Sequence, residues 1–124
     1  MGSKRSQPVP RPLKQAEYEI RFATREAEKG WIDLVATVKN ALADAWDFLT
    51  RTPQAGSEKV HQLRGDLAYT QVQGIEMAQW QYELPGGARI WYAVGGSPDG
   101  KHAGIVFLVR VCTSHPNETI GNYR

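Results

Sequence analysis

The segment GIVFLVRV, residues 104–111, is the sequence feature that most constrains the fold. Apolar residues occupy both sets of alternating positions in this run, so a strand made from it has two apolar faces. Such a strand is stable only in the interior of a sheet that is covered on both sides. The run ends abruptly in CTSHPNETIGNYR, which is either a surface tail or a segment that places a catalytic group, His115, at the edge of the sheet.

At 124 residues the chain is long enough for one domain with a modest core. Its hydrophobic content of 41% is ordinary for a soluble globular protein. No apolar run approaches the roughly 20 residues of a membrane span, so we expect no membrane partner. Cys112 is the only cysteine, which excludes an internal disulfide and fits a reducing, cytoplasmic location.

The net charge of +2 is unevenly distributed along the chain. Residues 1–16 contain four basic residues and no acidic one, and the remainder has 11 basic and 13 acidic residues, a net charge of −2. The prolines and few apolar residues of 1–16 predict a disordered leader, either solvated or acting as a docking peptide or electrostatic arm. A basic surface over the whole fold, typical of nucleic-acid-binding proteins, is not expected.

The first half of the chain predicts one strand followed by helices. YEIRF, residues 18–22, alternates as a half-buried strand does. Apolar residues then recur every three or four positions over 27–49, which predicts two helices with a break near 35–37. Thr24 is the predicted cap of the first helix, and Thr37 that of the second.

The second half predicts a meander of strands. AQWQYEL (78–84) alternates, PGG makes a turn, and ARIWYAV (88–94) returns toward the final apolar strand. The weaker LAYTQV (67–72) predicts one more strand. We therefore expect an α+β fold over 17–124, a single domain in which a helical hairpin packs on one face of an antiparallel sheet of about four strands.

The order of these motifs resembles the RelE/ParE toxin superfamily, whose members are toxins of bacterial type II toxin–antitoxin systems. The resemblance covers about residues 17–119. It rests on YEIRFATREAEKGW, a helical hairpin ending in LTRTP, then HQLRGDL, WQYELPGGARIWYAV and the strand that enters CTSHPNET. It implies a RelE-like fold and a toxin that cleaves messenger RNA in the ribosome without a metal.

By position in these motifs, the resemblance implies a catalytic set and an RNA-binding set of residues. The catalytic residues are His61, Arg89 and His115, and the RNA-binding residues are Lys59, Arg64 and Arg110. Histidine transfers protons near neutral pH, while arginine stays charged and can bind two phosphate oxygens at once. Cleavage by the neighbouring 2′-hydroxyl needs both functions. We expect no metal or other cofactor, because the three histidines and the cysteine lack the spacing of metal ligands.

These residue types also have structural explanations. A lone histidine is more often a turn or core residue than a catalytic one. Arg89 alternatively covers the sheet edge or pairs with Glu83, and Arg110 either finds a partner on a sheet face or ends its strand. His102 lies in a turn rich in glycine and proline, which predicts exposure to solvent.

Departures from the family pattern support an alternative function. The chain beyond its leader is slightly acidic, and Lys59 is the only lysine in a loop where one branch of the family has paired lysines. The leader itself is also additional. The alternative is a non-catalytic interaction protein of the same fold, either a gyrase-binding toxin or an inactive homologue.

The resemblance also implies a small antitoxin as partner, and messenger RNA and the ribosome as partners of a nuclease. Antitoxin segments that fold on a toxin need an apolar groove and cations to bind. Trp31 and Trp46 lie on the apolar stripe of the helices, which is expected to be core with a groove at its outer edge. Arg64 and Arg89 would supply the cations.

Overall fold

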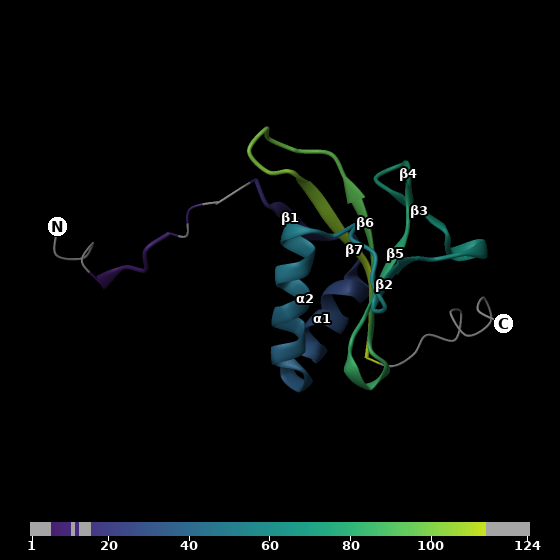
Figure 1. Cartoon of the computed structure of the whole chain (residues 1–124), viewed down its shortest axis with the longest axis horizontal. Coiled ribbons are helices and arrows are strands. Elements are labelled where there is room, and N and C mark those ends of the chain that lie inside the picture. Colours follow the sequence, from purple (N-terminus) through teal and green to yellow (C-terminus); the bar gives the residue numbers. More distant parts are fainter. Residues whose placement is uncertain (1–5, 11, 13–15, 114–124) are drawn as a thin grey trace.

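A computed structural model of the chain describes residues 6–10, 12 and 16–113, in which one strand, two helices and six further strands follow one another (Figure 1). The strands and helices are β1 (Tyr18–Phe22), α1 (Arg25–Thr37), α2 (Lys39–Arg51), β2 (Val60–Gln62), β3 (Tyr69–Val72), β4 (Ile75–Ala78), β5 (Trp80–Glu83), β6 (Arg89–Gly95) and β7 (Gly104–Cys112). Most of the predicted leader lies outside the described residues.

The apolar strand β7 lies in the interior of a five-stranded sheet with the order β1-β7-β6-β5-β2. It pairs in parallel with β1 and antiparallel with β6. The α+β class is confirmed, but the prediction of a purely antiparallel sheet of about four strands is wrong. The helices carry the chain from β1 at one edge to β2 at the other, and the strands β2, β5, β6 and β7 then fill the sheet back toward β1. After this return, β7 runs in the same direction as β1.

The two helices form a hairpin on one face of the sheet, as predicted (Figure 1). The Thr24 hydroxyl caps α1 by accepting a hydrogen bond from the N–H three residues on, and it donates to the Val109 carbonyl at 2.8 Å. The helices break at Val38, but Thr37 is not the cap of α2, because its hydroxyl donates to the Asp33 carbonyl one turn back. In the described part of the chain, neither helix has the length and apolar character to cross a membrane.

The segment LAYTQV supplies a strand, as predicted, but this strand does not join the main sheet. It contributes β3 to a separate two-stranded hairpin with β4. Gln73 and Gly74 at its turn have φ values of 54° and 79°, as in tight hairpin turns that match the twist of the strands. In its place, β2 pairs antiparallel with β5 at the edge of the main sheet. This strand was not predicted, because its three residues are too few to show an alternation of apolar and polar side chains.

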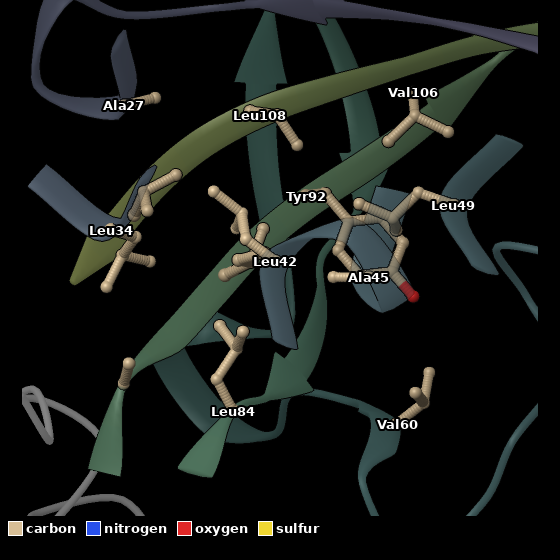
Figure 2. Packing of buried hydrophobic residues seen from close by; sticks show 13 residues of the cluster. Ala27, Leu34, Leu42, Ala45, Leu49, Val60, Leu84, Tyr92, Val106 and Leu108 are labelled. Atoms are coloured by element: carbon tan, nitrogen blue, oxygen red, sulfur yellow. The ribbon is translucent and has the colours of Figure 1, made fainter. Parts of the chain in front are cut away.

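Two apolar clusters hold these layers together. The larger lies between the helices and the sheet, and Tyr92 is near the centre of its labelled side chains (Figure 2). The Tyr92 hydroxyl donates to the Pro53 carbonyl at 2.5 Å, so the polar end of this buried ring has a partner. In the smaller cluster, Val72 of the β3–β4 hairpin packs with Ile105 and other residues of β6 and β7 on the opposite face. Strand β7 is therefore covered on both faces.

Helix α1 approaches β7 closely at Gly30. A Cβ atom at this position would lie 2.0 Å from the carbonyl oxygen of Val111, far inside van der Waals contact. The helix can rest on the strand at this point because residue 30 has no side chain.

Gly30→Ala is expected to lower the free energy of unfolding by about 1–3 kcal/mol, since the added methyl group forces α1 away from β7. The sign of this change tests the packing, because alanine in a helix interior normally makes a protein more stable than glycine does, by about 1 kcal/mol. Urea unfolding followed by circular dichroism measures the change. The exposed Ala36→Gly on the same helix is the control and should cost about 1 kcal/mol. A more stable Gly30→Ala protein would contradict this packing.

Candidate functional site

A row of side chains crosses the face of the main sheet opposite the helices, here called the hairpin face because β3–β4 covers part of it. The register pairs His61 on β2 with Gln81 on β5. It then pairs Gln81 with Trp91 on β6, and Trp91 with Arg110 on β7. The alternate residues of these strands, such as Ile90, belong to the core under the helices, so the row points the other way. Two of the predicted site residues, His61 and Arg110, therefore share one face.

The centre of the row is fixed by Trp91. Its ring nitrogen Nε1 donates to Oε1 of Gln81 at 2.9 Å, and both side chains are buried. The guanidinium carbon of Arg110 lies 5.3 Å from the centroid of the Trp91 ring, a cation–π contact of about 0.5–1 kcal/mol where it is partly exposed. Of the two alternatives for Arg110, the one with a partner on a sheet face is confirmed.

Arg89 lies two residues before Trp91 on β6, on the same face, and is almost fully buried, with 9% of its side chain exposed. Its Nη2 lies 3.0 Å from Oε1 of Glu83, its register partner on β5, and its Nη1 donates to the Ala88 carbonyl at 3.1 Å. Within the described residues, its buried Nε has no hydrogen-bond partner. A buried guanidinium with an unused donor is costly, and such groups need a specific explanation.

His61 lies within the electrostatic reach of three charged groups. Burial is the main cause that lowers the pKa of the His61 imidazole below its ordinary value. The Glu83 carboxylate opposes this shift, while the guanidinium groups of Arg64 and Arg89 add to it. The imidazole is therefore mainly neutral at pH 7 and can accept a proton.

The other predicted RNA-binding residues lie at the edge of this face. Lys59 directly precedes β2, and its carbonyl accepts a hydrogen bond from the Glu83 N–H at 2.8 Å. Arg64 has extended backbone and begins the short 3₁₀ turn Gly65–Leu67 that follows β2. Both side chains are exposed. The described part of the site thus has two long, exposed cationic side chains at its edge, Lys59 and Arg64. Further in, the guanidinium groups of Arg89 and Arg110 are each held by a neighbouring side chain.

His115 lies outside the described residues, and the structure describes the chain only as far as Thr113. Sequence reasoning gave no site role to Glu83, Gln81 or Trp91. A signal for the first two was present, because the alternation of AQWQYEL sets its glutamines and glutamate on the face opposite Trp80. Nothing in the sequence indicated which residues of other strands would lie beside them.

A second surface lies on the helix side of β1, where aromatic residues remain partly uncovered. The Phe22 and Trp31 rings meet edge to face at 6.4 Å, and Trp31 meets Trp46 in the same way at 6.2 Å. Trp46 is 47% exposed, so the prediction that it belongs to the core is wrong. The apolar stripe of the two helices is wider than the sheet can cover. At the edge of this stripe, Trp31, Ile32 and Leu108 line a hollow of about 360 Å³. We call Phe22, Trp31, Ile32 and Trp46 the tryptophan patch.

Comparison with known proteins gives no assignment for either surface. No protein-family model, curated protein or solved structure matches the chain. The imidazole and guanidinium groups of the hairpin face are the features that point to a function.

The electrostatic coupling around His61 can be measured by NMR titration of its imidazole protons. The pKa should lie below the ordinary value of about 6.5. Glu83→Gln should lower it further, because a negative charge that favours the imidazolium is removed, and Arg64→Gln should raise it for the opposite reason. Glu76→Gln on the β3–β4 hairpin is the control and should leave the titration unchanged. A pKa at or above 6.5, insensitive to both changes, would show that these groups do not form one site.

Proposed function

We propose that the chain is a toxin of a bacterial type II toxin–antitoxin system and a metal-independent endoribonuclease that cleaves messenger RNA with the ribosome, in the cytoplasm. The proposal rests on the motif resemblance to the RelE/ParE superfamily. The observation that carries it is the grouping of a mainly neutral His61 with the guanidinium groups of Arg64 and Arg89, while Arg110 lies further along the same row of the hairpin face. A proton acceptor and fixed cations are what cleavage by a neighbouring 2′-hydroxyl requires.

Each described group has a role in this chemistry. The neutral imidazole of His61 takes the proton of the 2′-hydroxyl as that oxygen attacks the adjacent phosphorus. The 5′-oxygen leaves with a proton, for which the resemblance implies His115, and a 2′,3′-cyclic phosphate remains. In this proposal Arg89, held before the RNA arrives, stabilises the extra negative charge of the pentacoordinate intermediate. Arg110, three strands from His61 in the row, binds a neighbouring phosphate of the RNA.

The Glu83–Arg89 pair favours the alternative function, a non-catalytic protein of the same fold. Glu83 is 41% exposed and neutralises the Arg89 guanidinium on its solvent side. A phosphate reaching Arg89 must displace this carboxylate, because the unused Nε is itself buried. If the pair does not open, Arg89 is structural, and the hairpin face would serve a gyrase-binding toxin or an inactive homologue.

Expression in a bacterial host separates these functions. The wild-type chain is expected to arrest growth and to leave translated messages cut, with cyclic phosphate ends. His61→Gln should lower the cleavage rate by about 10²-fold or more, as expected for loss of a proton acceptor, and Arg110→Gln should lower it by weakening RNA binding. Cleavage is measured by mapping message ends after induction.

Arg51→Gln is the matched control, because Arg51 is an exposed arginine at the end of α2, on the helix side. It should cleave as the wild type does. Growth arrest with intact messages would rule out the nuclease and support a gyrase-binding toxin, and healthy growth with soluble wild-type protein would support an inactive homologue.

The proposed protein partner is a small antitoxin with apolar and acidic residues, and the tryptophan patch offers the apolar surface it needs. Phe22 lies on β1, an edge strand of the main sheet, so the patch adjoins backbone groups that a further strand could pair with. Arg64 remains available as an exposed cation, but Arg89 is held by Glu83 and is a poor contact for a partner.

Trp46→Asp is expected to weaken partner binding while leaving the toxin active. The measurement is growth after co-expression with the antitoxin, which this proposal expects to be encoded by a small reading frame next to this gene. That partner should rescue cells expressing the wild type but not cells expressing Trp46→Asp, since a carboxylate in the patch opposes apolar burial. Ile75→Asp, which changes an exposed apolar residue of the β3–β4 hairpin, is the control and should be rescued. Equal rescue of both variants would exclude the patch as the binding surface.

A further inference from the structure

Three side chains that can bind a metal meet at the end of the sheet opposite the candidate site. Glu19 comes from β1, while Asp99 and His102 belong to the loop between β6 and β7 at the top of Figure 1. Their ligand atoms all lie within 4.8 Å of one another. Glu19 is far in sequence from Asp99 and His102, and the expectation of no metal site considered only the spacing of the histidines and the cysteine. His102 does not simply face solvent, because its Nδ1 lies 2.8 Å from Oδ2 of Asp99.

Backbone hydrogen bonds hold the loop in this position. Oδ1 of Asp99 accepts from the N–H groups of Lys101 and His102, at 2.8 and 2.9 Å. The hydrogen bond from the His102 N–H is the main cause that lowers the pKa of Asp99, so its carboxylate is ionised. The N–H of Ala103 donates to the Glu17 carbonyl at 3.0 Å and fixes the loop against the start of β1.

In each carboxylate, one oxygen accepts hydrogen bonds from neighbouring groups and the other lies toward Nδ1 of His102. Glu19 accepts from Nε of Arg21 through Oε1, and its Oε2 lies 3.9 Å from Nδ1 of His102. Asp99 is supported at Oδ1 and presents Oδ2 to the same nitrogen. Supporting hydrogen bonds of this kind orient the ligands in metal sites. The inward atoms are one imidazole nitrogen and two carboxylate oxygens.

We propose that Glu19, Asp99 and His102 bind a zinc ion through Oε2, Oδ2 and Nδ1. Zinc bonds of about 2.0–2.1 Å in a tetrahedron set neighbouring ligand atoms about 3.3 Å apart, and the observed separations of 2.8 and 3.9 Å bracket this value. Water takes the fourth position, since all three side chains are partly exposed. The imidazole favours zinc over magnesium and calcium, which prefer oxygen ligands.

The site lies at the far end of β7 from Arg110, so it is not part of the proposed cleavage chemistry. Glu19 pairs with Ile105 near the start of β7, whereas Trp91 pairs with Arg110 near its end. An ion here would join the edge strand β1 to the β6–β7 loop and stabilise the fold. Binding to the folded chain alone raises its stability with zinc concentration.

Calorimetry on the full chain without an affinity tag, titrated with zinc chloride in excess magnesium, tests the proposal. The wild type should bind one zinc ion at this site. Asp99→Asn should weaken its affinity by about tenfold or more, as should His102→Ala, because each removes one of three ligands. Asp99→Asn is the sharper variant, because Asn retains Oδ1 for both backbone hydrogen bonds and keeps the loop folded. Thermal unfolding with and without zinc is the second readout.

The controls remove groups of the same kind elsewhere in the chain. Asp66→Asn and His61→Ala should bind zinc as the wild type does, and so should Cys112→Ser. The proposal is overturned if the wild type binds no zinc, which would leave Asp99 and His102 as a hydrogen-bonded pair. It is equally overturned if Asp99→Asn and His102→Ala bind with wild-type affinity while His61→Ala or Cys112→Ser does not.

Discussion

The burial of both faces of β7 is the constraint on which the rest of the structure depends. Val106 and Leu108 face the helices, and Ile105 and Phe107 face the β3–β4 hairpin. Full burial of such side chains contributes about 1.5–3 kcal/mol each, so the strand requires a cover on each side. The helices cross the sheet from edge to edge and cover one face broadly. The small hairpin covers only part of the other, the part near the β6–β7 loop.

The polar groups gather on the part of that face that lies beyond the hairpin. A buried tryptophan there needs a partner for its ring N–H, which Gln81 provides, and the π face of Trp91 then carries the Arg110 guanidinium. Arg89 is held by Glu83 with one donor left over. An apolar covering would have stabilised the sheet more simply. Local conflicts of this kind are expected at functional sites, where binding rather than stability selects the residues.

Strand β7 also separates the two proposed sites. Its last residues carry Arg110 and adjoin Arg89, while its first residues pair with β1 next to Glu19. The parallel edge strand β1 has one neighbour in the sheet, so its position depends on that pairing and on the β6–β7 loop. A metal bound by this loop would therefore affect the stability of the edge strand, and the groups around His61 would keep their geometry.

The sequence by itself determined those helices and strands that depend on the pattern of neighbouring residues. The two-faced apolar run predicted an interior strand, the period of the helical stripe predicted two helices, and Thr24 predicted where the first begins. Only the tertiary structure decided which residues meet across strands. The parallel pairing of β1, the row from His61 to Arg110, and the approach of Glu19 to His102 all join residues distant in the chain. Their register follows from strand order and from a bulge near Trp91, and no local pattern encodes either.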